Sequence, residues 1–276
     1  MSEVLDDVIE SVRGHYHATG LTERLKAALG PEDQRLDPEK LGALDHFHTR
    51  GLAATAELAE MAGIGAGASV LDVGAGIGGP ARFVAQQLNC QVVGIDLSPP
   101  FVEAARYLSA RTGQSGQVSF EVASALDIPF GAGQFDFALL QHVAMNIADR
   151  EGLYDEIRRV LKPGGRFATY DVVLKSGEPL YPLPWARTPS TSCLLTAEAT
   201  QAAIEAAGFR TLIAKDDSEA AKTWFSQLRA SGPPPMPNLG LVMGPDFIEL
   251  TTNLGRSLME GRVGILAAVF EATRAD

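Results

Sequence analysis

The stretch VLDVGAGIGGPARF, Val70–Phe83, decides the fold. An apolar, β-prone run leads into four closely spaced glycines and then into a segment with helical spacing. In a strand–turn–helix unit of this kind, backbone N–H groups at the start of the helix point at whatever lies beyond the strand. Gly74 to Gly79 also satisfies G-x-G-x-x-G, which is typical of nicotinamide and flavin dinucleotide sites. Because this motif alone is a weak signal, the ligand must be identified from the sequence before and after it.

Composition limits the class of protein. The 276 residues are 46% hydrophobic and 21% charged, which is typical of a globular protein with one large domain or one domain and a cap. With 23 Lys and Arg against 34 Asp and Glu, the net charge of −11 argues against a nucleic-acid partner. The acidic start, MSEVLDDVIE, is unlike a signal peptide, and no apolar run reaches about 20 residues. These features predict a cytoplasmic protein with no membrane partner.

From residue 69 onward, short β-rich runs alternate with helix-like segments. The runs are SVLDVG (69–74), QVVGID (91–96), QVSFEV (117–122), FDFALL (135–140) and RFATYDVV (166–173). Such alternation predicts an α/β fold in which helices cover both faces of a mostly parallel, doubly wound sheet. Ser98 is predicted to cap one intervening helix with Pro99 in its first turn, and Asp149 to cap another that KPGG ends. The apolar stripes of these helices are Phe101, Ala104, Ala105 and Leu108, and Leu153, Ile157, Val160 and Leu161.

The remaining segments suggest a cap and two insertions. Residues 1–62 have helical spacing and no β-run, which predicts an N-terminal helical cap before a core over residues 63–276. Insertions on the substrate side are expected near 174–196 and 216–258, where EPLYPLPWARTP predicts an extended loop and GPPPMP a break. A helix is expected near Thr196–Ala207, a strand near 209–215 and a last β-run at 262–272.

The second run ends in Asp96, 17 residues after Gly79, where a carboxylate can accept both hydroxyls of a ribose. This arrangement fits NAD and S-adenosylmethionine alike. Four motifs in order, VLDVGAGIGG, VVGIDLSP, ASALDIPF and LKPGGRFATYD, resemble the class I S-adenosylmethionine-dependent methyltransferases over roughly residues 41–225. The resemblance implies S-adenosylmethionine as cofactor and a seven-stranded sheet in the order 3-2-1-4-5-7-6. RVGILAAVFEA would supply its antiparallel seventh strand.

The resemblance also implies a set of cofactor contacts. Gly74 and Gly76 would lie against the methionine portion, Asp96 would bind the ribose, and Leu97 would pack on adenine. The other implied cofactor residues are Ser124, Ala125, Leu126, Gln141 and Arg50. The family usually has Asp at the position of Ser124, so its contact with the adenine amino group would be weaker. Asp72 is left open between a supporting role and direct contact.

Candidate catalytic residues follow the fourth run. His142 and Asn146 are four apart and would share a face if a helical turn forms there, and His142 is either a general base or a pocket residue. Related small-molecule methyltransferases use an early tyrosine to close over the cofactor, which implies a role for Tyr16. The other histidines, His15, His17, His46 and His48, lack the i, i+4 spacing of helical metal ligands, so no metal is expected. Cys90 and Cys193 also follow no metal spacing.

The substrate is the least determined element. LDHFHTRGLAATAEL and QHVAMNI resemble bacterial sarcosine and dimethylglycine N-methyltransferases. Trp185 and Tyr181 offer aromatic faces to an ammonium, and Arg187 or Arg50 can pair with a carboxylate. O- or C-methylation of an aromatic or other secondary metabolite is the alternative, and an NAD-dependent oxidoreductase is the alternative of another class. A small-molecule substrate is expected, bound by a monomer or a homodimer.

Overall fold

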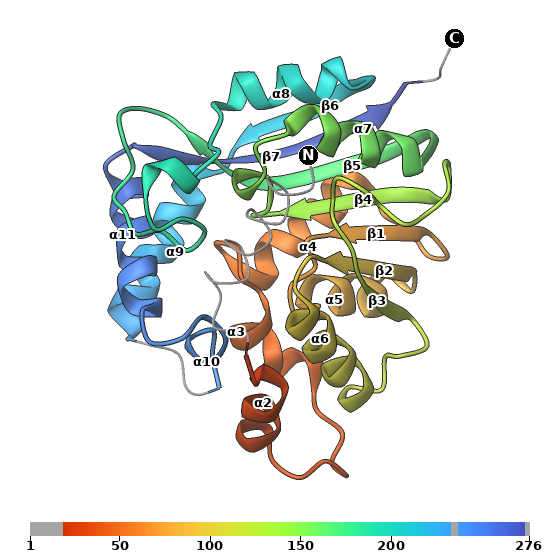
Figure 1. The fold of residues 1–276 in the computed structure, drawn as a ribbon, viewed down its shortest axis with the longest axis vertical. Helices are drawn as coiled ribbons and strands as arrows, with labels where there is room; N and C mark the ends of the chain where they lie inside the picture. The colour runs from red at the N-terminus through yellow and green to blue at the C-terminus, as the bar shows by residue number, and fades with distance from the viewer. Residues whose placement is uncertain (1–18, 233–236, 274–276) are drawn as a thin grey trace.

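The structure is a computed structural model that describes residues 19–232 and 237–273. Tyr16, His15 and His17, like most of the GPPPMP run, lie outside these residues. A seven-stranded sheet runs through the molecule in the order β3-β2-β1-β4-β5-β7-β6 (Figure 1). Its strands are β1 (Ser69–Val73), β2 (Gln91–Asp96), β3 (Val118–Val122), β4 (Phe135–Gln141), β5 (Leu161–Leu174), β6 (Phe209–Asp216) and β7 (Val263–Ala272). The predicted fold class and strand order are confirmed.

Strand direction also agrees with the prediction. β1 to β5 pair in parallel, and β7 pairs antiparallel with both β5 and β6. The strand expected at 166–173 is longer, because β5 begins directly after the preceding helix at Leu161. Its register with β4 jumps from Leu161 opposite Phe135 to Arg166 opposite Phe137, so KPGG bulges out of the pairing.

Helices cover the two faces of the sheet as the alternating sequence requires. On one face lie α4 (Gly51–Ala62), α5 (Gly79–Leu88) and α6 (Pro99–Arg111), and on the other α7 (Arg150–Val160) and α8 (Ala197–Ala206). Successive residues of β1 show the division, because Val70 packs into the first layer and Leu71 into the second. The predicted apolar stripes of α6 and α7 are buried.

The predicted caps are partly borne out. The Asp149 side chain accepts a hydrogen bond from the Gly152 N–H at 2.9 Å, and Thr196 caps α8 in the same way through Ala199 at 3.2 Å. Ser98 occupies the N-cap position of α6, but its hydroxyl makes no capping bond. The Ser98 N–H instead donates to Asp96, so Asp96 takes part in shaping the start of this helix.

Two groups of helices flank the carboxyl ends of the parallel strands (Figure 1). The first comprises α2 (Leu21–Leu29), a 3-10 turn at Pro38–Leu41 and α3 (Gly42–Asp45); the second comprises α9 (Ser218–Ser231), α10 (Gly240–Met243) and α11 (Phe247–Met259). Residues 19–62 contain no strand, as expected. However, α4 packs against the sheet through Leu58 and Ala62, so a cap that ends at residue 62 remains a prediction.

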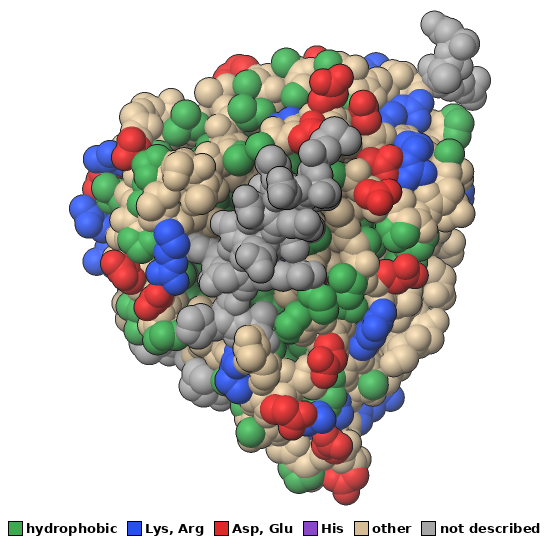
Figure 2. Space-filling model, in the orientation of Figure 1, with side chains coloured by type: hydrophobic (Ala, Val, Ile, Leu, Met, Phe, Trp, Pro, Cys, Tyr) green, Lys and Arg blue, Asp and Glu red, His purple; other side chains and the backbone are tan. Residues whose placement is uncertain are grey.

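On the face drawn in Figure 2, Lys and Arg side chains are scattered among Asp and Glu. No helix within the described part of the chain has both the length and the apolar character needed to cross a membrane.

Candidate active site

The glycine turn between β1 and α5 has the backbone that its sequence predicts. Gly74, Gly76 and Gly78 have φ values of 75°, 54° and 81°, in the left-handed region that favours glycine. A Cβ on Gly74 would lie 2.3 Å from the Val143 side chain, and one on Gly78 would lie 2.5 Å from Phe120. Gly76 differs, since the nearest atom to its Cβ would be 3.5 Å away on Phe47. Gly74 and Gly78 are therefore required by packing, whereas Gly76 leaves space in front of the loop.

Asp96, at the end of β2, joins the glycine turn to α6. Its two carboxylate oxygens accept bonds from the Gly76 N–H and the Ser98 N–H, both at 2.9 Å. Burial raises the pKa of Asp96 to about 6, and burial together with the charge of Asp96 raises that of Asp72 to about 7. Two buried carboxyls at one strand edge favour partners that donate hydrogen bonds.

A cavity of about 1620 Å³ opens in front of these strand ends. We call the part of its wall that carries the predicted cofactor residues the glycine-loop side. These residues are Gly74, Gly76, Asp96, Leu97, Ser124, Ala125, Leu126 and Gln141. Arg50, His142, Asn146, Trp185 and Arg187 also line it. The structure therefore brings together nearly all of the residues predicted from the motifs.

Buried polar atoms on the glycine-loop side fit an adenosine and amino-acid ligand. Of the described residues that line the cavity, Gln141 and Ser98 have buried atoms, Nε2 and Oγ, without a hydrogen-bond partner. Asp72 Oδ2 is also buried and without a partner, but Asp72 is not one of the lining residues. The Gln141 Oε1 already accepts bonds from His48 at 2.9 Å and Thr55 at 3.1 Å, which turns its Nε2 donor toward other partners. Ser124 Oγ accepts the Leu126 N–H at 3.1 Å, so it is a weaker acceptor for an adenine amino group than an aspartate would be.

His142 sits at the end of β4 with a left-handed backbone, φ 54°. The helical turn that would have linked it to Asn146 does not form, because only Ala144–Asn146 make a short 3-10 turn. Both side chains nevertheless line the cavity. Burial in the cavity wall lowers the pKa of His142 to about 3, so its imidazole is neutral at physiological pH. A left-handed non-glycine residue at a cavity wall is typical of a functional position.

A chain of polar contacts leads from His142 away from the cavity. His142 Nε2 lies 3.4 Å from Thr49 Oγ1, and Thr49 Oγ1 lies 3.4 Å from the Tyr170 hydroxyl. The Tyr170 hydroxyl in turn donates to Asp217 Oδ2 at 3.1 Å. Burial raises the pKa of Tyr170, which keeps its proton on the phenol oxygen. Sequence reasoning missed Thr49, Tyr170 and Asp217, because they come from distant segments.

Arg50 is the last residue in this chain of contacts, and its guanidinium is paired with acidic side chains of the protein. It pairs with Glu57 and, at 2.5 Å, with Asp217. The bond to Glu57 and the pair with Asp217 raise the pKa of Arg50. Burial alone would raise the pKa of Asp217, but Lys215 and Arg50 hold it below its ordinary value. Two carboxylates thus already compensate the charge of Arg50.

His46 and His48 have structural partners. His46 Nδ1 lies 2.7 Å from Asp45 Oδ1, and Arg82 Nη2 lies 2.8 Å from the other oxygen of that carboxylate, which ties the segment before α4 to α5. Burial and the neighbouring histidines lower the pKa of His48 well below its ordinary value. Within residues 19–232 and 237–273, no group of three or more His, Cys, Asp or Glu side chains is arranged to hold a metal ion.

The far wall of the cavity is apolar and comes from the C-terminal helices. We call this wall the apolar chamber: Trp224, Phe225, Leu228, Met243, Phe247, Ile248, Leu250 and Leu254 of α9 to α11. Trp185 lines the cavity from the proline-rich loop, with only 4% of its surface exposed and its indole N–H bonded to Ser192 Oγ at 3.0 Å. The sequence located this insertion but did not identify its wall residues, because the apolar faces of these helices resemble core faces.

Two predicted substrate residues are placed differently from the expectation. Tyr181 packs against the sheet's main hydrophobic core and is not among the described residues that line the cavity. Arg187 lines the cavity, but its guanidinium pairs with Asp246 at 2.7 Å. The prediction that Tyr16 closes the site concerns a residue outside the described part of the chain.

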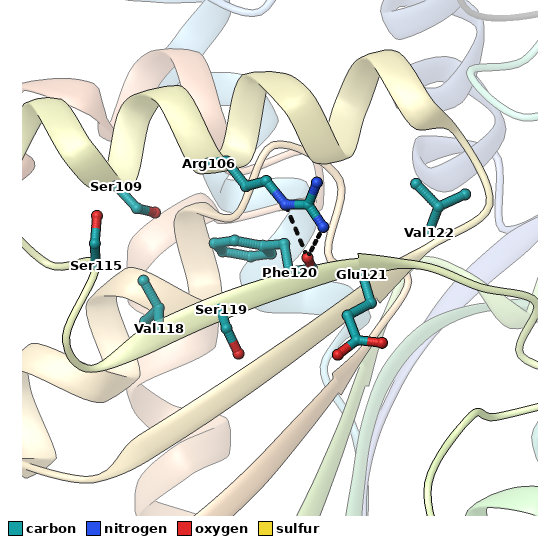
Figure 3. A pocket seen from close by; sticks show the side chains of 8 residues that line it. All are labelled: Arg106, Ser109, Ser115, Val118, Ser119, Phe120, Glu121 and Val122. Carbon is teal, nitrogen blue, oxygen red and sulfur yellow. Dashed lines mark hydrogen bonds between the residues drawn. The ribbon is translucent and has the colours of Figure 1, made fainter.

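A second, smaller pocket of about 560 Å³ lies between α6 and β3 and shares no lining residue with the large cavity (Figure 3). Its one cation, Arg106, donates from Nε at 3.0 Å and from Nη2 at 2.5 Å to the Phe120 carbonyl oxygen (Figure 3). Because Arg106 is committed to the backbone, this pocket offers a ligand only hydroxyls and apolar surface besides the exposed Glu121.

Comparisons with known proteins identify the family. The sequence profile described as "Methyltransferase domain" matches residues 71–169. Methyltransferase GfsG of Streptomyces halstedii is 30% identical over 207 residues, which cover 73% of this chain and 71% of that protein. Sterol 24-C-methyltransferase of Eremothecium gossypii is 39% identical over 117 residues, but these span only 42% of this chain and 31% of that enzyme. The chain belongs to the class I S-adenosylmethionine-dependent methyltransferases.

Solved structures agree in fold. The [4+2]-cyclase SpnF superposes with a TM-score of 0.65 at 25% identity, covering 81% of this chain and 82% of SpnF. A putative sarcosine dimethylglycine methyltransferase from Galdieria sulphuraria has a TM-score of 0.61 at 18% identity, with 80% and 86% covered. The likeness to the Galdieria protein supports the fold alone. Membership of the sarcosine and dimethylglycine N-methyltransferases therefore stays a prediction.

Proposed function

We propose that this protein transfers the methyl group of S-adenosylmethionine to an oxygen of a small-molecule acceptor bound in the same cavity. The observation that carries the proposal is the shared cavity, in which the glycine-loop side and the apolar chamber face one space. Pockets for one drug-sized ligand are about 300–1,000 Å³. A cavity of about 1620 Å³ therefore suits two ligands side by side.

The glycine-loop side would hold the cofactor through Asp96, the backbone of Gly76 and the amide nitrogen of Gln141. When bound, S-adenosylmethionine supplies an electrophilic methyl group that already carries its leaving group. Catalysis then depends mainly on alignment and exclusion of water, effects that are worth roughly 7–11 kcal/mol in favourable intramolecular cases. The protein's chief task is to hold two ligands in line.

His142 is our candidate for the group that accepts the proton of an acceptor hydroxyl. With a pKa of about 3, its imidazole is neutral at physiological pH but only weakly basic, so it would accept the proton only as the methyl group leaves the cofactor sulfur. If Asp217 accepts from Tyr170 and Tyr170 accepts from Thr49, then His142 Nε2–H donates to Thr49 Oγ1. Nδ1 would then carry the free lone pair. The proton would pass to Nδ1 as the new carbon–oxygen bond forms.

An amine acceptor with a carboxylate, such as dimethylglycine, is supported less well. The two cations predicted to bind its carboxylate, Arg50 and Arg187, are already paired with acidic side chains. A transfer assay with methyl-labelled S-adenosylmethionine and a metabolite extract, read by mass spectrometry, tests this. Label on an oxygen of the product is expected, and label found only on amine nitrogens would contradict the proposal.

A second candidate function is a cyclisation that needs no methyl transfer. It is favoured by the likeness to the [4+2]-cyclase SpnF at 25% identity over 81% of this chain. The same assay separates the two. A cyclase would convert a substrate to a product of unchanged mass and leave the label on the cofactor.

A further inference from the structure

We infer that the acceptor is a bulky, predominantly apolar and uncharged molecule, which the apolar chamber recognises by its shape. This inference rests on the proposed transfer and names its substrate class. It follows from three features of the same cavity, which are its volume, the chemistry of its far wall and the pairing of its charged side chains.

The volume sets the size of the acceptor. If the cofactor took the upper end of the range for drug-sized ligands, roughly 600 Å³ of the cavity would remain. A molecule with only a few heavy atoms, such as an N-methylated glycine, would leave most of that space to water. A ligand of multi-ring size would instead remove the wall from water.

The wall sets the polarity of the acceptor. Trp224, Phe225 and Leu228 of α9 face the same space as Met243, Phe247 and Leu254 of α10 and α11. Of these, Phe225, Met243 and Leu254 are buried in the free protein, with exposures of 6%, 9% and 5%. The stabilisation that an acceptor gains is roughly proportional to the apolar surface that it removes from water. An apolar acceptor therefore gains from those parts of the wall that water still reaches in the free protein, and a polar acceptor loses its hydration without replacement.

Charge pairing sets the charge of the acceptor. Of the described residues that line the cavity, three are arginines, namely Arg50, Arg187 and Arg229. Two of them pair with acidic side chains of the protein, and Arg229 is exposed on α9, where solvent screens its charge. A buried carboxylate or phosphate on the acceptor would thus lack a buried, uncommitted cation in the described wall.

Binding of the neutral, apolar dye Nile red, measured by fluorescence with S-adenosylhomocysteine present, tests the chamber separately from transfer. Ile248 lines the cavity yet is 74% exposed, so Ile248→Asp places a charge there with little risk to folding. Leu228→Asp places a charge in the chamber from a different helix, α9, at a half-buried position. The matched control is Ile213→Asp, which is 41% exposed on β6 and lies away from the described cavity wall.

We expect both chamber variants to bind the dye at least tenfold more weakly, while Ile213→Asp and Arg229→Gln bind it as the wild type does. Affinity for S-adenosylhomocysteine should stay unchanged in all four, which also reports that they fold. Unchanged dye binding in both chamber variants would overturn the inference. So would label transfer to dimethylglycine in preference to neutral, multi-ring alcohols, provided that Arg229→Gln abolishes it.

The outcomes for the two proposals are distinguishable. Dye binding that depends on the chamber, with no label transferred to any acceptor, would contradict the proposed function and leave the chamber assignment standing. Label transfer to an oxygen of a small, charged acceptor, with no dye binding, would overturn the chamber assignment and leave the proposed function standing.

Discussion

The two sides of the cavity are built by different means. The glycine-loop side is shaped mainly by its backbone conformation. Glycines at φ values of 75° and 54° precede a helix, and Asp96 accepts hydrogen bonds from two backbone N–H groups. In the apolar chamber, side chains from three separate helices make a wall with no such motif. Backbone geometry needs particular residues at fixed spacing, whereas an apolar wall tolerates many sequences. One side is therefore suited to a constant ligand and the other to a variable one.

The largest expected effect is that of Gly76→Val on the glycine-loop side. A β-branched residue is disfavoured at φ 54°, and its side chain would project into the space in front of the loop. We expect calorimetry to show affinity for S-adenosylhomocysteine reduced about a hundredfold or more, a loss of about 2.7 kcal/mol. The control is Gly133→Val, which has a similar φ of 68° and open space around it. If both variants bind equally well, the glycine loop is not the ligand site.

The next effect concerns His142, which lies where the two sides meet. A general base contributes about 10²–10⁴-fold, so His142→Ala should lower turnover by at least a hundredfold at pH 7. Because the pKa of His142 is about 3, the wild-type rate should show no inflection from this group between pH 5 and 9. The variant should regain rate as pH rises and the acceptor ionises by itself. A small loss that is the same at every pH would assign His142 to packing.

A smaller effect is expected for Asp96→Ala. A charged acceptor contributes about 1.5–3 kcal/mol per hydrogen bond, so cofactor affinity should fall at least tenfold. The effect of the substitution on S-adenosylhomocysteine binding can be compared with that of Asp127→Ala, an exposed carboxylate of the neighbouring loop. Equal affinities in the two variants would show that Asp96 only supports Gly76 and Ser98.

The pKa of Asp96 also predicts that cofactor affinity depends on pH. The size of this effect should be comparable to or smaller than that of Asp96→Ala. Burial raises the pKa of Asp96 to about 6 in the free protein. Ribose hydroxyls donate to the ionised form, so binding favours loss of the proton and affinity falls as pH drops below about 6. At pH 5 the affinity should be roughly tenfold lower than at pH 8, since about a tenth of the carboxyls are ionised. Asp96→Asn should flatten this titration, and an unchanged slope would point to Asp72 instead.

The smallest effect should come from the rim of the chamber. The ion pair between Arg187 and Asp246 is exposed, with 45% and 41% of the side chains accessible, and such pairs contribute about 0–1 kcal/mol. Arg187→Gln should therefore alter the melting temperature and KM for the acceptor only slightly. A large rise in KM would indicate that Arg187 leaves Asp246 to bind the acceptor.

The same difference between the two sides explains what the sequence could predict. The glycine turn and Asp96 follow from local patterns, because backbone hydrogen bonding and left-handed glycines fix them within a few residues, whereas the strand order and Gln141 came from the resemblance to a family. Thr49 and Tyr170 are 121 positions apart and Tyr170 and Asp217 are 47 apart, so no local pattern reveals that they meet. The roles predicted for Tyr181 and Arg187 stay predictions, although Tyr181 packs against the core and Arg187 pairs with Asp246. Whether an aromatic ring packs inward or a cation finds a partner depends on helices elsewhere in the chain.

Calorimetric titration with S-adenosylhomocysteine, with and without NADH as competitor, tests most directly that the glycine-loop side holds a sulfonium nucleoside. We predict that S-adenosylhomocysteine binds with one site per chain, raises the melting temperature and is not displaced by NADH. Binding and stabilisation by NADH, with none by S-adenosylhomocysteine, would contradict the account.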